Sequence, residues 1–222
     1  MKIANPGMTA TELLNILNAR RFNFYDEFNR QADDPEVWTN AGDGSFSSFA
    51  QVDSPTIWNL TSGNIIDNDH YVEGSTSVYG KRFTPFEEGY STVTFEARVA
   101  LVSIVDLSAL LGLFETLLTD YAEPASRSME FFVDPAITNT FRVRTYAGAE
   151  EETDTLVALD TDYHIFKMVW TTTSVLLYID DVLVATHETQ VPDQPMFIEF
   201  LIRTEAAANK TVALDYVHVE LS

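Results

Sequence analysis

The hydrophobic pattern is clearest in residues 163–188, which read YHIFKMVWTTTSVLLYIDDVLVATHE. Two apolar runs flank Asp180-Asp181, and large apolar side chains occupy both alternating sets of positions in each run. Strands that are apolar on both faces are typical of the interior of a two-layer β-sandwich. The segment therefore predicts a strand pair whose turn lies at the two aspartates. The side chains expected to point into the core are those of Phe166, Met168 and Trp170.

Other strands are predicted where short apolar or alternating segments lie between turn-forming residues. The clearest alternation is YSTVTFEARVAL at 90–101, where one face is expected to be buried and the other to meet water. Gly, Ser, Asp and Asn make 40–55 a predicted loop with at most a short strand at 46–52. The remaining predicted strands are 22–28, 57–61, 63–67, 75–84, 127–134, 140–147, 155–159, 196–204 and 211–221.

Two segments have helical patterns. Residues 9–21 (TATELLNILNARR) combine a capping-box spacing of Thr9 and Glu12 with an apolar stripe, which predicts a short helix. Such a helix needs tertiary contacts to persist, so it either packs on the sandwich or docks on a neighbouring subunit. Residues 106–120 also fit a helical stripe, but a doubly buried strand at 109–116 is the rival, and periodicity does not decide between them.

Length and composition fit one globular domain. A chain of 222 residues with 45% apolar residues can bury a core as an undivided all-β domain. Many short strands with few helices are typical of a sandwich or jelly roll. The predicted organisation is an N-terminal arm at 1–21 and a sandwich of two antiparallel sheets at 22–222.

The charge balance is strongly acidic, with 34 Asp and Glu against 13 Lys and Arg. An acidic surface repels phosphate, so neither nucleic acid nor an anionic membrane is an expected partner. The sequence has no cysteine, which excludes disulfides and thiol chemistry. The first residues lack an uninterrupted apolar stretch, so we expect synthesis in the cytoplasm without a signal peptide.

Several motifs resemble, in their order and spacing, the laminarinase-like glycoside hydrolases of family 16. They are FYDEF at 24–28 followed by Trp38, TVTFEARVAL at 92–101, LYIDDVLVAT at 177–186 and VALDYVHVEL at 212–221. The resemblance covers about residues 22–222 and implies a concanavalin A-like (LamG or laminarinase-type) jelly roll in which 109–116 is a strand. Relatives usually have Asp-Gly at the turn, and Asp181 tolerates the positive φ required there at a small cost.

The family's catalytic residues do not carry over to this chain. Its members have Glu-x-Asp-x-x-Glu or Glu-x-Asp-x-Glu on one strand, and the corresponding segment is SMEFFVD at 128–134. Glu130 and Asp134 remain, but Phe132 replaces the central acid. Four strand residues span about 13 Å, whereas retaining chemistry needs carboxyl groups about 5–5.5 Å apart and inverting chemistry about 6.5–9.5 Å. We therefore predict a protein that is not an enzyme.

Other catalytic patterns are also missing. Glu152-x-Asp154 has Val157 at the third position, and its acidic run is expected to be a solvated turn or edge. There is no nucleophile elbow and no phosphate-binding loop. No metal-ligand spacing relates the four histidines, His70, His164, His187 and His218.

One calcium site is implied by the resemblance. Laminarinase-like folds often hold a calcium between the first and last strands, and Asp215 matches the position that supplies the carboxylate. Glu27 is the candidate second ligand, since calcium prefers oxygen ligands. Two acids that are solvated or in salt bridges are the alternative. Asp67-x-Asp69 lacks the remaining ligands of a calcium loop and is expected to be a polar turn.

A candidate binding face lies on the strands that resemble the family's concave sheet. Sugar sites combine aromatic faces with polar groups. In TFRVRTYA at 140–147, two arginines and a tyrosine share one face, which therefore is not core. In so acidic a chain, we expect the arginines to bind internal or intersubunit acids first and a glycan second. The candidate contact residues are Trp58, Tyr79, Glu130, Arg142, Arg144 and Tyr146.

The second half of the chain further resembles non-catalytic domains of structural proteins of bacterial viruses. With the missing acids and the N-terminal arm, this favours a non-enzymatic decoration, fibre or adhesin module on the surface of a virus particle. Such a protein is expected to be homo-oligomeric or repeated on a lattice. Two alternatives remain open, namely a lectin-like carbohydrate-binding module and a divergent glycoside hydrolase.

Overall fold

The computed structural model describes residues 22–26, 38–42, 58–62, 69–74, 82–86, 90–116, 127–134 and 136–222. The predicted helix at 9–21 and the predicted strand at 63–67 lie outside these residues. Every regular element in the described part is a β-strand. Accordingly, these residues include no helix with the length and apolar character needed to cross a bilayer.

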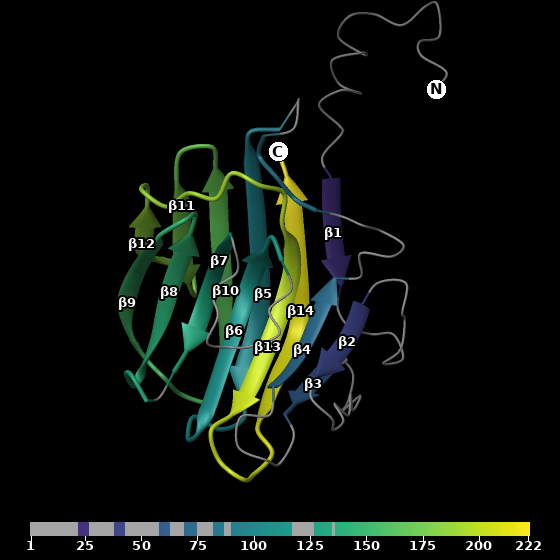
Figure 1. The fold of residues 1–222 in the computed structure, drawn as a ribbon, viewed down its shortest axis with the longest axis vertical. Helices are drawn as coiled ribbons and strands as arrows, with labels where there is room; N and C mark the ends of the chain where they lie inside the picture. Colours follow the sequence, from purple (N-terminus) through teal and green to yellow (C-terminus); the bar gives the residue numbers. More distant parts are fainter. Residues whose placement is uncertain are drawn as a thin grey trace, which may run out of the picture.

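The described strands form two antiparallel sheets (Figure 1). Sheet A runs β1-β14-β5-β10-β11-β12, with β3 also paired to β14, and sheet B runs β2-β4-β13-β6-β7-β8-β9. The strands of sheet A are β1 (Phe22–Asp26), β3 (Trp58–Thr61), β5 (Thr92–Leu101), β10 (Tyr163–Thr171), β11 (Val175–Ile179), β12 (Val182–His187) and β14 (Thr211–Leu221). Those of sheet B are β2 (Trp38–Gly42), β4 (Asp69–Gly74), β6 (Leu107–Phe114), β7 (Ser128–Val133), β8 (Thr140–Tyr146), β9 (Glu150–Ala158) and β13 (Phe197–Thr204).

The core lies between the two sheets. Alternate residues of β5 are buried, as the sequence predicted, and their polar neighbours are half-exposed on the outer face of sheet A. Phe166, Met168 and Trp170 of β10 are buried in the same core, which confirms their predicted orientation. The prediction of an all-β fold with two layers is therefore correct. It succeeded because alternate side chains along a strand point to the same face.

The segment at 163–188 forms three strands instead of two, because Thr171 to Ser174 make a turn between β10 and β11. The turn predicted at the aspartates joins β11 to β12, with φ of 51° at Asp180 and 63° at Asp181. The prediction that both faces avoid water was wrong for β12. Its Val182 and Leu183 are 64% and 50% exposed because β12 is the edge strand of sheet A.

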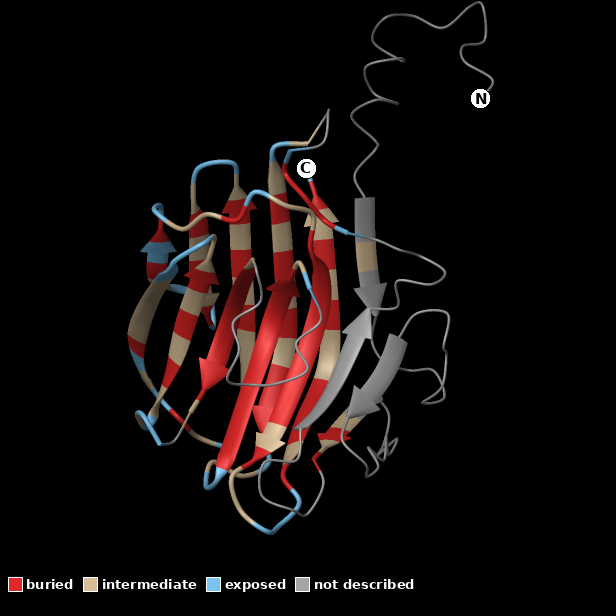
Figure 2. Cartoon of the chain, in the orientation of Figure 1, coloured by how far each residue is buried: buried red, intermediate tan, exposed pale blue. Residues whose placement is uncertain are grey.

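Residues 107–114 form strand β6, so the helical alternative is wrong. All eight side chains of β6 are buried, and β6 pairs with β13 on one side and β7 on the other. A central strand that is buried on both faces needs no alternation, which is why its apolar spacing also fitted a helix. Figure 2 shows the same burial along β6 and β7.

Two strands were not predicted. β2 includes residues assigned to a loop, and β4 begins at Asp69, where a polar turn was expected. Both are rich in Gly, Asn, Asp or Glu, which are weak strand formers. Pairing of β4 with β13, and of β2 with β4, supplies the hydrogen bonds that local sequence does not favour.

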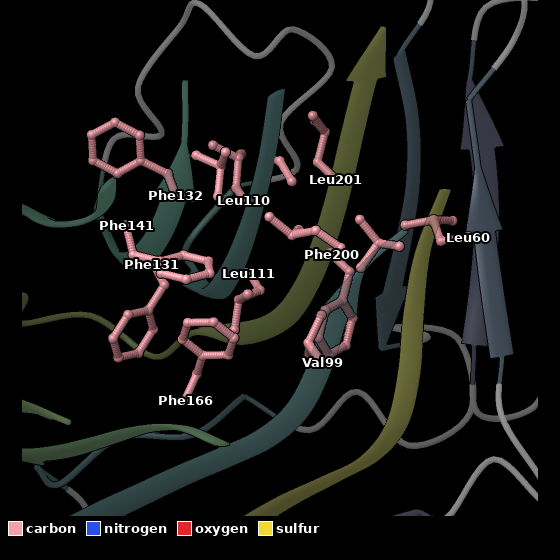
Figure 3. A pocket seen from close by; sticks show the side chains of 14 residues that line it. Leu60, Val99, Leu110, Leu111, Phe131, Phe132, Phe141, Phe166, Phe200 and Leu201 are labelled. Atoms are coloured by element: carbon pink, nitrogen blue, oxygen red, sulfur yellow. The ribbon is translucent and has the colours of Figure 1, made fainter. Parts of the chain in front are cut away.

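The core contains a small cavity of about 20 Å³ (Figure 3). Its walls are apolar side chains from both sheets, including Val99, Phe131, Phe166 and Phe200. A space of this size holds at most one water, and apolar cavities stay dry. The cavity is therefore a gap in packing, and its lining residues offer no polar side chain to a ligand.

Candidate functional site

The candidate site lies on the outer face of sheet B, which is the face turned away from sheet A. Outward-pointing residues of neighbouring strands form a row across it, because residues paired in register share a face. Glu199 of β13 pairs with Gly112 of β6, Gly112 with Glu130 of β7, Glu130 with Arg144 of β8, and Arg144 with Glu152 of β9. The row brings together three acids and one arginine from four strands.

Glu130 is the central member of this row. Its side chain is 1% exposed and forms an ion pair with Arg144 through Oε1. The other carboxylate oxygen, Oε2, is buried without a hydrogen-bond partner among the described residues. Burial raises the pKa of Glu130 above its ordinary value, although the positive charge and hydrogen bond of Arg144 act in the opposite direction.

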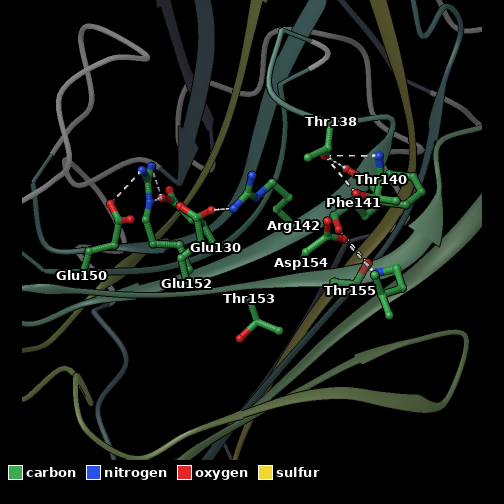
Figure 4. Close-up of polar contacts among 12 residues, drawn as sticks. Glu130, Thr138, Thr140, Phe141, Arg142, Glu150, Glu152, Thr153, Asp154 and Thr155 are labelled. Atoms are coloured by element: carbon green, nitrogen blue, oxygen red, sulfur yellow. Dashed lines mark hydrogen bonds and ion pairs between the residues drawn. The ribbon is translucent and has the colours of Figure 1, made fainter.

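The two arginines of β8 form ion pairs with acids of the same chain. Figure 4 shows Arg142 beside Glu152. Arg142 pairs with Glu152, and Arg144 reaches Glu150 at 3.5 Å in addition to Glu130. This is the internal pairing expected of arginines in an acidic chain. Glu152 lies in an acidic run that was expected to be a solvated turn or an edge. This run forms β9, the edge strand of sheet B.

Apolar side chains flank the row on both sides along the strands. Leu110, Phe114, Phe132, Phe197 and Leu201 form a second buried cluster, separate from the main core. Guanidinium carbons of Arg144 and Arg142 lie 5.0 and 5.7 Å from the Phe132 ring centre. Phe132 therefore packs apolar surface beside Glu130.

The other predicted contact residues do not all join this face. Trp58 begins β3, which pairs with β14 in sheet A, so its strand belongs to the opposite sheet. Tyr79 lies outside the described residues. Tyr146 is on β8, half-buried, and pairs in register with Ser128. The structure thus groups Glu130, Arg142, Arg144 and Tyr146 and separates Trp58 from them.

Asp134, the second acid of the segment that resembles the family's catalytic strand, directly follows β7 and serves a turn. Its Oδ1 accepts a hydrogen bond of 3.0 Å from the Ala136 N–H, and its carbonyl accepts from Ile137 and Thr138. The carboxyl group is therefore already used to close a local turn, as aspartates commonly do.

Asp215, the predicted calcium ligand, lies on β14 where the register shifts between Leu214 and Tyr216. Its carboxylate forms an ion pair with Arg98, which also stacks at 4.3 Å on Tyr163. Glu27 lies outside the described residues. The described part of the chain contains no group of three acids or histidines able to hold a metal. The Arg98 contact matches the salt-bridged alternative, and calcium remains a prediction.

Glu199 was missed by the sequence reasoning. It lies in FIEFLIRT at 197–204, a segment that reads as an apolar strand, and its side chain is fully buried. Strong burial of an acid is unusual, because desolvating a carboxylate is costly. The signal available in the sequence was a single acid within an apolar strand. Its position beside Gly112 could not be predicted, because it depends on which strands are neighbours.

Two histidines have distinct environments, His187 on the edge strand β12 and His164 on the interior strand β10. His187 is buried and bonds Thr145 at 2.9 Å and Thr153 at 3.0 Å, and burial lowers its pKa. For His164, burial lowers the pKa, but hydrogen bonds from its ring to Asp180 and Asp160 outweigh this and raise it. Neither histidine touches the row on sheet B through a contact in the described residues.

Comparisons with known proteins agree with the fold. A sequence model of Glycosyl hydrolases family 16 matches residues 127–217, which is less than half of the chain. No curated protein sequence matches it. Many solved structures do, at low sequence identity.

Three of these structures illustrate the similarity. A prokaryotic β-1,3-1,4-glucanase (lichenase) from a mouse hindgut metagenome is 14% identical, with a TM-score of 0.63 over 89% of this chain and 98% of that one. The laminarinase catalytic domain of Thermotoga maritima is 14% identical, with a TM-score of 0.65 over 90% and 97%. The endo-β-1,3-glucanase of Pyrococcus furiosus is 14% identical, with a TM-score of 0.66 over 89% and 93%.

At these identities the similarity establishes architecture. The matched residues 127–217 run from the start of β7 into β14 and include Glu130, Arg144 and Glu199. The chain therefore has the concanavalin A-like jelly-roll fold of the family 16 glycoside hydrolases.

Proposed function

We propose that this protein is a divergent glycoside hydrolase that acts on a β-linked glucan, with Glu130 as one of its reacting carboxyl groups. The observation that carries the proposal is the state of Glu130, which is buried, has a raised pKa and keeps one oxygen without a partner. The glucanases that share the fold give the substrate class. No observation supports the virus-particle role expected from the sequence.

The chemistry of Glu130 fits proton transfer to or from a sugar. A carboxyl group acts best in acid–base catalysis when its pKa is near the working pH, and burial in apolar surroundings is the usual means of raising it. Arg144 holds Oε1 and so fixes the orientation of the group, which leaves Oε2 for a ligand.

A second candidate function is glucan binding without cleavage. It is favoured by Phe132, which stands in place of the central acid, and by Asp134, which is committed to its turn. Under this alternative the polar atoms of β7 and β8 hold sugar hydroxyls, and Glu130 only accepts hydrogen bonds.

The test uses the full chain with soluble β-1,3-glucan and mixed β-1,3-1,4-glucan. We expect release of reducing ends, and we expect Glu130→Gln to lower the rate at least about 100-fold, as loss of an acid–base group does. Glu96→Gln, on sheet A, is the matched control and should keep the rate.

Affinity electrophoresis on the same polysaccharides separates the two candidates. Retarded migration without reducing ends would support binding alone. Neither cleavage nor retardation on either glucan would overturn both functions.

A further inference from the structure

We propose that His164 is a proton-controlled latch that holds the β9–β10 connection, residues 159–162, against the turn between β11 and β12. With the ring charged, Asp160 of the connection and Asp180 of the turn are both bound to it. With the ring neutral, Asp180 stays bound and Asp160 is released. The latch is separate from the proposed hydrolysis, because His164 lies on β10 of sheet A and Glu130 lies on β7 of sheet B.

The two ring nitrogens of His164 each face a carboxylate. Nδ1 lies 2.6 Å from Oδ2 of Asp180, and Nε2 lies 3.0 Å from Oδ1 of Asp160. An ionised carboxylate accepts hydrogen bonds and donates none, so the two contacts together need a hydrogen on each nitrogen. Neutral imidazole has one N–H, whereas imidazolium has two. The pair of bonds is therefore complete when His164 is protonated.

The groups around the imidazole ring favour this protonated form. Asp160 and Asp180 are the charged groups that face the ring in the described part of the chain. Phe141 of β8 and Phe166 of β10 pack against it with ring centres 5.3 and 6.1 Å away, and its register partner on β5 is Val99. Burial of the ring lowers its pKa, but the two aspartates outweigh this effect and raise the pKa above the usual 6.5. The latch is therefore closed in mild acid and opens as pH rises through the folded-state pKa.

Asp180 has bonds to β10 that do not depend on the proton. Its Oδ1 accepts a hydrogen bond of 2.8 Å from the Ile165 N–H, and its own N–H donates to the Ile165 carbonyl at 2.9 Å. The other described bond of Asp160 comes from the Asp162 N–H at 2.8 Å, within the same connection. Loss of the proton leaves one ring nitrogen facing a carboxylate without a hydrogen, and the two like charges repel each other. The contact that breaks is therefore the one to Asp160, and the remaining hydrogen stays on Nδ1.

The opening is confined to residues 160–162. Leu159 is buried in the main core, and its N–H donates to the Asn139 carbonyl at 2.9 Å. On the other side of the connection, Tyr163 pairs in register with Ala100 of β5. Core packing and backbone pairing do not change with the charge of the ring, so β9 and β10 stay in place and the connection between them changes.

NMR of the full chain between pH 5 and 9 tests the latch. The nitrogen-15 shifts of the His164 ring report its charge and which nitrogen keeps the hydrogen. We expect imidazolium at pH 5 and the Nδ1–H tautomer once the ring is neutral. Backbone order parameters of Thr161 and Asp162 should be about 0.85 at pH 5 and fall below about 0.6 when the ring loses its proton, whereas those of Leu159 and Ile165 should stay near 0.85.

Two variants should fix the latch in opposite states. Asp180→Asn keeps an oxygen for the Ile165 N–H and offers an amide N–H to Nδ1, and asparagine tolerates the φ of 51° at this position. The neutral ring should then hold its hydrogen on Nε2 and retain Asp160, so the connection stays ordered at every pH. Asp160→Ala removes the acid that the latch holds, and the connection should be mobile at pH 5 as well.

Asp181→Asn is the matched control. It removes a charge from the same turn, at a φ of 63° that asparagine also tolerates, and should keep the tautomer and the order parameters of the unmodified chain. A neutral ring with its hydrogen on Nε2 in the unmodified chain, or equal order of residues 160–162 at pH 5 and 9, would overturn the latch. So would a His164 ring that is already neutral at pH 5.

Discussion

The two faces of β7 in sheet B are both buried but differ in how they are stabilised. On the inner face of β7, Met129, Phe131 and Val133 pack into the main core between the sheets. On the outer face of the same strand, Ser128 and Glu130 are as deeply buried but polar. Inner and outer residues alternate along β7, so one short strand has both kinds of buried environment.

The difference shows that burial and apolarity are separate properties. The inner face gains free energy from removing apolar area from water and from close packing. The outer face buries charge, which costs free energy unless a partner offsets it. Arg144 is that partner for Glu130. It does not offset the whole cost of burial, because the pKa of Glu130 is still raised and its Oε2 has no hydrogen-bond partner among the described residues. Buried polar groups of this kind do not stabilise the fold, so a role in binding a ligand explains them better.

The inner face should give the largest loss of stability. Phe131 is fully buried, and its ring lies 5.0 Å from that of Phe166 in the opposite sheet. Phe131→Ala should lower the free energy of unfolding by about 3–5 kcal/mol, measured by urea denaturation. Leu183→Ala, at a half-exposed position on β12, is the control and should change it by less than about 0.5 kcal/mol. Equal effects of the two variants would contradict the assignment of Phe131 to the core.

The ion pair of the outer face should give a smaller, pH-dependent loss. Arg144→Ala leaves Glu130 buried without its cation and should cost about 3 kcal/mol at pH 8. Without Arg144 the pKa of Glu130 rises further, so at pH 5 the neutral carboxyl is favoured and the loss should shrink. Arg142→Ala removes a pair whose acid, Glu152, is 21% exposed, and should cost about 1 kcal/mol or less. A loss that is independent of pH would show that Glu130 is not the group affected.

Substitution of either of the two histidines should change stability least. The contributions of the two histidines to stability should depend on pH in opposite directions. Burial lowers the pKa of His187, so the unfolded chain binds the proton more readily and stability should fall as pH drops below about 6.5. Carboxylate hydrogen bonds raise the pKa of His164, so its stabilisation is fully present below about 6.5 and lost as pH rises through the folded-state pKa.

Thermal unfolding of variants between pH 5 and 9 checks both signs. His187→Gln should flatten the loss of stability on acidification, although it also removes bonds to Thr145 and Thr153 at every pH. His164→Gln should be more destabilising at pH 5.5 than at pH 8.5. Parallel pH curves for both variants and the unmodified chain would exclude these histidines as the titrating groups.

The local pattern of the sequence determined which side chains point inward. The alternation in β5, the inward residues of β10, the aspartate turn before β12 and the shared face of Arg142 and Arg144 all follow from the period of two along a strand and from turn chemistry. Alternation could not identify β6 as a strand, because both of its faces are buried and its residues do not alternate between apolar and polar.

Only the tertiary structure decided which strands are neighbours, and the candidate site depends on that order. It places Trp58 in sheet A, joins Asp215 to Arg98, and sets Glu199 opposite Glu130 although 69 positions separate them in the sequence. Periodicity assigns a residue to a face but contains no information on strand order or register between distant segments. For this protein the sequence therefore determined the layers and the core, and strand pairing determined the arrangement of its buried acids.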